Sequence, residues 1–204
     1  MKNTLRLFFT LFLGIFSADF AYTQEIISPS FKNGDWWIMT LERSTEGLSR
    51  SGACYESYEK YLVKIVGDKQ KVFVGNNLDQ EIECEEISDR LLGSITKTRL
   101  HIPFPLTINS EKMFDTEKFP WETVTAKAYS RTSFKLAGKE NKEIDAVLIS
   151  RTARPRGKNA AFDDKLIYSQ ECKCVLDFNR TRSNEKTGVL VTQKQTVINY
   201  EIAP

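Results

Sequence analysis

The chain has 204 residues, a formal net charge of +2 and 41% hydrophobic residues. A charge this small does not indicate a nucleic-acid partner, and this hydrophobic content is that of a folded protein rather than a disordered one. The length fits one domain with a core of its own.

The N-terminus has the layout of a secretory signal peptide. Two basic residues precede a short apolar run at residues 7–16, and small residues follow. The run is shorter than the roughly 20 residues that a membrane-spanning helix needs. We therefore expect residues 1–23 to be a signal peptide and residues 24–204 to form a single β-rich domain. The mature chain is expected to be exported, periplasmic or secreted, without an integral membrane span.

Strand-like patterns open the mature chain. Residues 36–41 are aromatic or branched and follow an Asn-Gly-Asp turn signal. Residues 55–66 fit both a helical and an alternating pattern. Because Gly67 and a second apolar run at residues 72–74 follow, we expect a β-hairpin there. Residues 81–92 are acidic and weakly patterned, and they allow one short helix.

The second half of the chain alternates more regularly. Residues 95–106 alternate until two prolines end the pattern, since proline donates no ladder hydrogen bond. Residues 124–136 are expected to keep one apolar face throughout, and residues 143–150 form the next strand. Residues 151–164 are predicted to be the longest polar loop. The two final strands occupy residues 166–200.

These patterns give roughly seven to ten strands joined by short turns, with no run of helical segments between them. Such an order is typical of an antiparallel sheet and not of a parallel α/β fold. We therefore expect a mainly β fold, an antiparallel up-and-down sheet curved into a full or partial barrel. A two-sheet β-sandwich is the alternative.

Four short motifs occur in an order that resembles a family of bacterial exported β-rich proteins of unknown function. They are Gly34-Asp35-Trp36-Trp37, Pro105-Leu106 followed by Trp121, Gly138-Lys139-Glu140, and Tyr168-Ser169-Gln170-Glu171. The family has a late Trp-Tyr-Ser-Pro-Glu strand, in which this chain places Ile167 and Gln170 at the Trp and Pro positions, and the cysteines are not part of the family pattern. More remotely, the chain is similar to periplasmic lipoprotein-carrier half-barrels, which hold acyl chains in an apolar concavity. The resemblance implies a β fold and a lipid-binding option, and it implies no catalytic residue.

The four cysteines favour disulfides over a metal site in an exported chain. Cys172 and Cys174 are two apart in an expected strand, so their Cα atoms would be about 6.6 Å apart, near the upper limit for a bridge. A bridge between them would need a bulge, and we expect them to pair instead with Cys54 and Cys84. One alternative is a local Cys54–Cys84 bridge that leaves Cys172 and Cys174 strained or free and redox-active. Another is a four-cysteine zinc site, whose usual spacing is absent.

Two further groups of residues are candidates for ligand binding. The aromatic residues that could line a ligand cavity, or simply pack in the core, are Trp36, Trp37, Trp121 and Tyr168. The basic residues that could bind a phosphate, an acidic glycan or a lipid head group, or form a solvated loop, are Arg151, Arg154, Arg156 and Lys158. The basic group has no interleaved aromatic residues, so the stacking platform for single-stranded nucleic acid is missing.

Enzymatic motifs are weak. His101 is the single histidine, and its neighbours supply neither a nucleophile nor an orienting carboxylate. Ser57 and Lys60 match Ser-x-x-Lys, and residues 186–188 match Lys-Thr-Gly, but no Ser-x-Asn lies suitably between them. We therefore expect no catalytic residue, no cofactor and no metal.

The sequence as a whole favours a non-enzymatic exported envelope protein that binds a hydrophobic or amphiphilic ligand, or another envelope protein, on a curved β-sheet. Lipid is one such ligand. One alternative is a purely structural or interaction module of the envelope. The other is a thiol-disulfide active protein that uses Cys172 and Cys174.

Overall fold

The computed structural model describes residues 25–45, 60–82, 102, 104–113, 121–137, 142–155, 160–184 and 190–204. The expected signal peptide, residues 1–23, lies outside the described residues. All the regular secondary structure of the described residues is β-strand. The strands are β1 (Glu25–Ile26), β2 (Trp36–Thr45), β3 (Lys60–Val66), β4 (Lys69–Val74), β5 (Gln80–Ile82), β6 (Leu106–Thr107), β7 (Glu111–Met113), β8 (Trp121–Lys135), β9 (Glu143–Pro155), β10 (Ala160–Ser169), β11 (Cys174–Asn184) and β12 (Leu190–Glu201).

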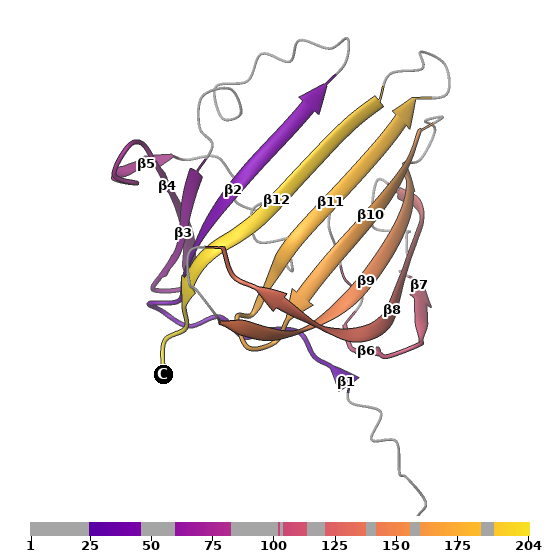
Figure 1. The fold of residues 1–204 in the computed structure, drawn as a ribbon, viewed down its shortest axis with the longest axis horizontal. Coiled ribbons are helices and arrows are strands. Elements are labelled where there is room, and N and C mark those ends of the chain that lie inside the picture. The colour runs from indigo at the N-terminus through magenta and orange to yellow at the C-terminus, as the bar shows by residue number, and fades with distance from the viewer. Residues whose placement is uncertain are drawn as a thin grey trace, which may run out of the picture.

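Ten strands form one antiparallel sheet in the order β5-β4-β3-β2-β12-β11-β10-β9-β8-β7, and β1 pairs separately with β6. The sheet is strongly curved, and its ends, β5 and β7, do not pair with each other (Figure 1). The expected mainly β, antiparallel fold is therefore confirmed. Among the described strands the sheet is curved but does not close into a full barrel.

The sheet consists of two meanders joined at one place. Strands β2 to β5 follow one another across one part, and strands β7 to β12 follow one another across the other. The two parts meet where β2 pairs antiparallel with β12. The first long strand of the chain and the last one therefore lie side by side inside the sheet.

The expected hairpin after residue 60 is confirmed, since β3 and β4 pair antiparallel through a tight turn. Gly67 in this turn has φ of 66°, a left-handed conformation that glycine adopts without the steric cost of a side chain. Its amide donates a hydrogen bond of 2.8 Å to the Asn33 side-chain oxygen. The Asn-Gly-Asp turn signal before β2 is thus in contact with the β3–β4 turn.

Side chains on the two faces of the sheet have different surroundings. We call the face that carries Trp37 and Met39 the inner face, and the opposite one the outer face. Directly paired residues share a face, so the inner face includes the row Leu41, Gln195, Phe178, Leu166, Ile149 and Ala128. Buried apolar residues form two core clusters, one centred on Trp37 and one on Phe178.

Two bulges change which residues are buried. The expected single apolar face of residues 124–136 is wrong, because the register of β8 shifts between Ala128 and Ser130. Ala128 lies in the Phe178 cluster, whereas Leu136 lies in the Trp37 cluster. A second shift, in the β10–β11 pairing, leaves Leu176 as an extra residue in β11. An extra residue in a strand reverses the alternation beyond it.

The expected polar loop at residues 151–164 is also wrong. Strand β9 continues to Pro155 and β10 begins at Ala160, so most of this range belongs to two paired strands. The cause is a row of charged residues that are buried and paired across strands, which look like loop residues in the sequence. Their arrangement is described below.

The start of β2 is held by a buried carboxylate. Asp35 is 0% exposed, and it accepts hydrogen bonds of 2.8 Å from the backbone amides of Lys32 and Ala203. It also forms a 2.8 Å ion pair with the Lys173 ammonium group. Burial acts to raise the pKa of Asp35, but Lys173 and the two amides outweigh it and hold the pKa below its usual value. One side chain therefore joins the start of β2, the turn before β11 and the C-terminus.

Replacing this carboxylate should weaken the fold. We expect Asp35→Asn to lower the free energy of unfolding by about 3 kcal/mol at neutral pH, because it breaks a buried ion pair. The native pKa lies below the unfolded one, so the contribution is present above the unfolded pKa of about 3.9 and is lost as the pH falls through the native pKa. The measurement is urea unfolding of the native protein and the variant between neutral and acidic pH.

Asp163→Asn is the matched control, because Asp163 is exposed on β10 and surface substitutions usually change stability by less than about 0.5 kcal/mol. If Asp35→Asn is as stable as this control at neutral pH, the carboxylate does not hold the fold.

Candidate binding face

Two of the aromatic residues that the sequence suggested for a ligand cavity, Trp37 and Tyr168, lie on the inner face. Other side chains pack closely around both of them. Trp37 and Tyr168 are both 0% exposed. The Trp37 ring meets Phe31 edge-on at 5.6 Å between centroids, and the Tyr168 ring lies 5.3 Å from that of Phe104. Burial raises the pKa of Tyr168 well above its usual value. Core packing, the alternative considered for these residues, is what the structure shows.

Trp36 and Trp37 are consecutive in β2 and face opposite sides of the sheet. They therefore cannot line the same cavity, which corrects the expectation of one shared ligand cavity. Trp36 is half-buried on the outer face, and its indole N–H donates a 3.2 Å hydrogen bond to Glu201. Trp121 begins β8, and its side chain lies outside the described residues.

A small pocket of about 150 Å³ lies beside Tyr168, near the start of β9, the end of β10 and β1. Its lining includes aliphatic residues and an exposed ion pair between Arg131 and Asp145, whose atoms are 2.6 Å apart. Ligand pockets for small molecules usually measure roughly 300–1,000 Å³. This pocket is therefore too small for an acyl chain.

One residue of the expected anion site, Arg151, belongs instead to a buried ion triad. Arg151 and Arg180 lie directly opposite Asp164 on the two neighbouring strands, and all three residues are at most 7% exposed. The Arg180 Nε lies 2.7 Å from one carboxylate oxygen, and Arg151 binds the other oxygen through two nitrogens. Burial acts to raise the pKa of Asp164, but the two guanidinium groups outweigh it and lower the pKa.

Because Asp164 already binds the Arg151 guanidinium, Arg151 is a structural residue and not part of an exposed basic loop. The backbone of Arg154 belongs to β9, paired with Thr123. Arg156 and Lys158 lie outside the described residues. Arg151 is therefore not available as an anion ligand, and an anion site at Arg154, Arg156 and Lys158 stays a prediction.

Cys172 and Cys174 form a disulfide with each other, with Cα atoms 5.3 Å apart. The expected pairing of each with Cys54 or Cys84 is wrong. The separation of about 6.6 Å for a strand does not apply, because Cys172 lies in a turn and β11 begins only at Cys174. Lys173 between them has φ of 54°, which folds the chain back. Cys54 and Cys84 lie outside the described residues.

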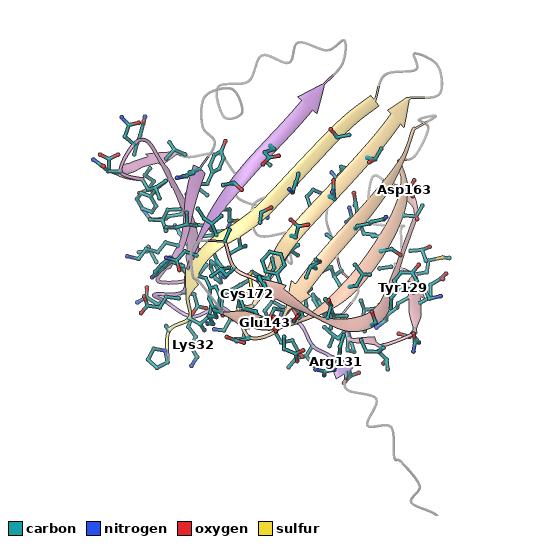
Figure 2. The ribbon with its side chains drawn as sticks, in the orientation of Figure 1. Lys32, Tyr129, Arg131, Glu143, Asp163 and Cys172 are labelled. Atoms are coloured by element: carbon teal, nitrogen blue, oxygen red, sulfur yellow. A yellow bond between two sulfur atoms is a disulfide. The ribbon has the colours of Figure 1, made fainter. Side chains whose placement is uncertain are left out.

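The disulfide is part of the core. Both cysteines are 0% exposed, and the Cys172 carbonyl accepts a 2.7 Å hydrogen bond from the Trp37 indole. Figure 2 shows Cys172 near the end of the sheet where β10 passes into β11. Thiol–disulfide exchange needs access of a thiolate to a sulfur atom, so this burial does not favour a redox role. Sulfurs that are joined to each other also cannot act as thiolate ligands, which excludes the four-cysteine zinc site.

A cluster of polar groups near the C-terminus is not poised for acid–base chemistry. The Tyr200 hydroxyl donates to Glu171 at 2.7 Å and accepts from Lys142 at 2.8 Å. Burial raises the Tyr200 pKa, the bond from Tyr200 lowers the Glu171 pKa, and the bond to Tyr200 raises the Lys142 pKa. Each group is moved away from neutrality, whereas a general acid or base works best with a pKa near the operating pH. Among the described residues, no group of three or more metal-binding side chains is present.

A partly exposed apolar region lies on the outer face of the β2–β4 part of the sheet, which forms the left side in Figure 1. The cross-strand pairs place two kinds of side chain together there. The apolar members are Trp36, Ile38, Leu62, Val66 and Phe73, and the basic members are Lys60, Lys64, Lys69 and Lys71. We call this set of nine residues the β2–β4 outer face.

The apolar members of the β2–β4 outer face are not fully buried. Four of them are half-buried, and Val66 is 41% exposed. They are also direct neighbours, since Leu62 pairs with Ile38 on one side and with Phe73 on the other. A continuous row of apolar side chains that crosses three strands and stays partly in water is a candidate interaction site.

The basic members surround this row. Lys64 lies directly opposite Lys71, and Lys71 forms a 2.7 Å ion pair with Glu81 on β5. Within the described part of the chain, Lys60, Lys64 and Lys69 form no ion pair. The sequence reasoning missed this face, although residues 60–66 contain the signal. Once they are assigned to a strand, Lys60, Leu62, Lys64 and Val66 must share one face.

The chain matches no protein-family model, no curated protein and no solved structure. The resemblance to the exported β-rich family and to lipoprotein carriers therefore stays a prediction. No helix in the described residues has the length and apolar character needed to cross a membrane.

The disulfide can be checked by peptide mapping without reduction. Trypsin cleaves after Lys165, Lys173 and Arg180, so we expect peptides 166–173 and 174–180 to stay joined until a reductant separates them. In the chain-entropy model, a bridge that closes so short a loop adds about 1.6 kcal/mol to the free energy of unfolding, whereas one that closes a loop of a hundred residues adds about 4.7 kcal/mol. Finding either peptide linked to a fragment with Cys54 or Cys84 would contradict the structure.

Proposed function

We propose that the protein is a non-enzymatic exported binding protein that uses the β2–β4 outer face to bind an amphiphilic partner. The observation that carries this proposal is the row of half-buried apolar residues framed by lysines on three adjacent strands. The proposal places the binding site on the outer face of the sheet, and not in a cavity lined by the aromatic residues that the sequence suggested.

The packing of the inner face supports this change. Trp37 on β2, Tyr61 on β3 and Val74 on β4 are each 0% exposed on the inner face. These strands therefore contribute fully to the core with one face, and the apolar residues of the other face are not needed for it. Exposing several adjacent apolar side chains raises the tendency of a soluble protein to associate, so a binding role accounts for their presence.

The chemistry of the β2–β4 outer face also fits an amphiphile. Trp36 has an apolar ring and a polar N–H, and such side chains favour boundaries between apolar and wet surroundings. Each lysine has a long aliphatic stem that can cover apolar surface while its ammonium group stays in water. Export, which would bring this face to lipids and envelope proteins, is supported by the signal-peptide pattern of residues 1–23.

Intrinsic fluorescence tests the proposal, because Trp36 belongs to the proposed site and Trp37 is buried. We expect zwitterionic dodecylphosphocholine micelles to shift the tryptophan emission of the native protein to shorter wavelength. Trp36→Phe should lose most of this shift, since it removes the reporter in contact with the micelle. Leu62→Gln should keep the reporter and weaken micelle binding several-fold, on the order of 1 kcal/mol of lost apolar contact.

Met113→Gln is the matched control, because Met113 is 65% exposed on β7, outside the β2–β4 outer face. It should bind micelles like the native protein. An unchanged emission spectrum in micelles, or a shift that Trp36→Phe retains in full, would refute the proposed function.

A further inference from the structure

We infer that the partner of the β2–β4 outer face is the surface of a bilayer that contains anionic phospholipid. This inference rests on the proposed function and adds the chemical class of the partner. It is carried by the arrangement of lysines on the face, which the amphiphilic character alone does not require.

The first observation is the direct pairing of two like charges. Lys64 and Lys71 lie opposite each other on β3 and β4, an arrangement that destabilises a sheet. Glu81 lies next to Lys71 and forms an ion pair with it, while Lys64 forms none within the described residues. An anionic partner would remove the repulsion that the fold leaves in place.

The second observation is the charge of the whole face. Its four lysines stand against three carboxylates: Glu81 and Glu201, which border it on β5 and β12, and the exposed Glu42, which lies further along β2 on the same side of the sheet. Asp68 lies beyond the face, in the β3–β4 turn. The face therefore keeps an excess of positive charge, although the chain as a whole has a formal charge of only +2. Each basic residue near an anionic membrane surface strengthens binding to it.

The third observation is how basic and apolar side chains alternate. On β3 the outer-face order is Lys60, Leu62, Lys64, Val66, so each lysine stem lies beside an apolar side chain. This arrangement lets apolar side chains enter the head-group region while the ammonium groups stay at the level of the phosphates. Trp36 lies beside Lys64 in the same row, and tryptophan is enriched at this depth of a membrane.

The geometry favours a surface over a smaller ligand or a nucleic acid. The face is spread over three strands, about 10 Å across at the usual strand spacing, and the pocket beside Tyr168 is lined by residues of other strands. The two aromatic residues of the β2–β4 outer face, Trp36 and Phe73, lie on different strands and do not belong to the same row of cross-strand partners. They do not form the continuous stacking platform that single-stranded nucleic acid requires.

Vesicle sedimentation tests the inference with two lipid compositions. The probes are vesicles of phosphatidylcholine alone and of phosphatidylcholine with about 30% phosphatidylglycerol, an anionic content chosen to give a clear negative surface potential. We expect the full-length mature protein to partition at least tenfold more strongly to the anionic vesicles. Added salt should reduce this preference, because it shortens the range of electrostatic attraction.

A pair of double variants separates a specific face from general charge attraction. Lys64→Gln with Lys69→Gln should weaken partitioning roughly thirtyfold, since two lysines at about 1 kcal/mol each are lost and about 1.4 kcal/mol corresponds to tenfold. Lys112→Gln with Lys165→Gln removes the same charge from exposed positions on β7 and β10. This control pair should keep most of the binding. Circular dichroism and thermal unfolding check that both variants fold.

Each outcome decides one of the two claims. Equal partitioning to both vesicle types, or equal losses in the two double variants, overturns the anionic-membrane inference. If micelles still shift the Trp36 emission in that case, the proposed function stands with an uncharged amphiphile or a protein as partner. If neither vesicles nor micelles bind, both the inference and the proposed function fail.

Discussion

The carboxylate of Asp35 joins three segments that are far apart in the sequence, and the rest of the structure depends on this junction. It binds the Lys173 ammonium group and the backbone amide of Ala203. Trp37, two residues after Asp35, donates a hydrogen bond from its indole N–H to the Cys172 carbonyl. The turn between β10 and β11 is therefore attached to the start of β2, and the C-terminus is attached to the same point. This attachment fixes the end of the β2–β12 pair, where the two meanders of the sheet meet. The short disulfide completes the turn that the junction holds.

The same constraint sets which face of β2 to β4 is free. With Trp37 committed to the core, the alternation of side chains along a strand directs Trp36 and Ile38 to the outer face. The pairing of β2 with β3 and of β3 with β4 then brings the lysines and apolar residues of three strands together. The charged side chains have different surroundings on the two faces. On the inner face Asp164 pairs with two arginines across neighbouring strands, whereas on the outer face lysines remain in water next to apolar side chains. Only the second arrangement leaves groups that can bind a partner.

Much of the fold could be predicted from the sequence, because antiparallel strands with one buried face produce a period of two. The strand after the Asn-Gly-Asp turn and the β3–β4 hairpin are visible in that period, whereas the first of the two strands predicted for residues 166–200 is interrupted by the turn that joins β10 to β11. The bulge at Tyr129 could not be predicted, since an extra residue leaves no signature in composition and reverses the alternation beyond it. The strand positions of Arg151 and Asp164 could not be predicted, because the two residues of a buried ion pair look like a solvated loop in the sequence until their cross-strand pairing is known. The Cys172–Cys174 bridge could not be predicted, because the turn that shortens the Cα–Cα distance places Lys173 in a left-handed conformation, which is uncommon for a residue other than glycine. The β2–β4 outer face could not be predicted for a related reason. Its residues come together only through the pairing of β2, β3 and β4, and none of these strands alone has a pattern that indicates a binding site.

The most direct test of the account is to locate membrane contact residue by residue. Lipids with a paramagnetic group in the head-group region broaden the NMR signals of nearby protein nuclei, and the three tryptophan indole N–H signals are well suited to this measurement. In anionic bicelles that contain such a lipid, the account predicts broadening of Trp36 and of the amides of β2 to β4, with Trp37 and the amides of β9 and β10 unaffected. Broadening centred on β8 to β10, or spread evenly over the protein, would contradict it.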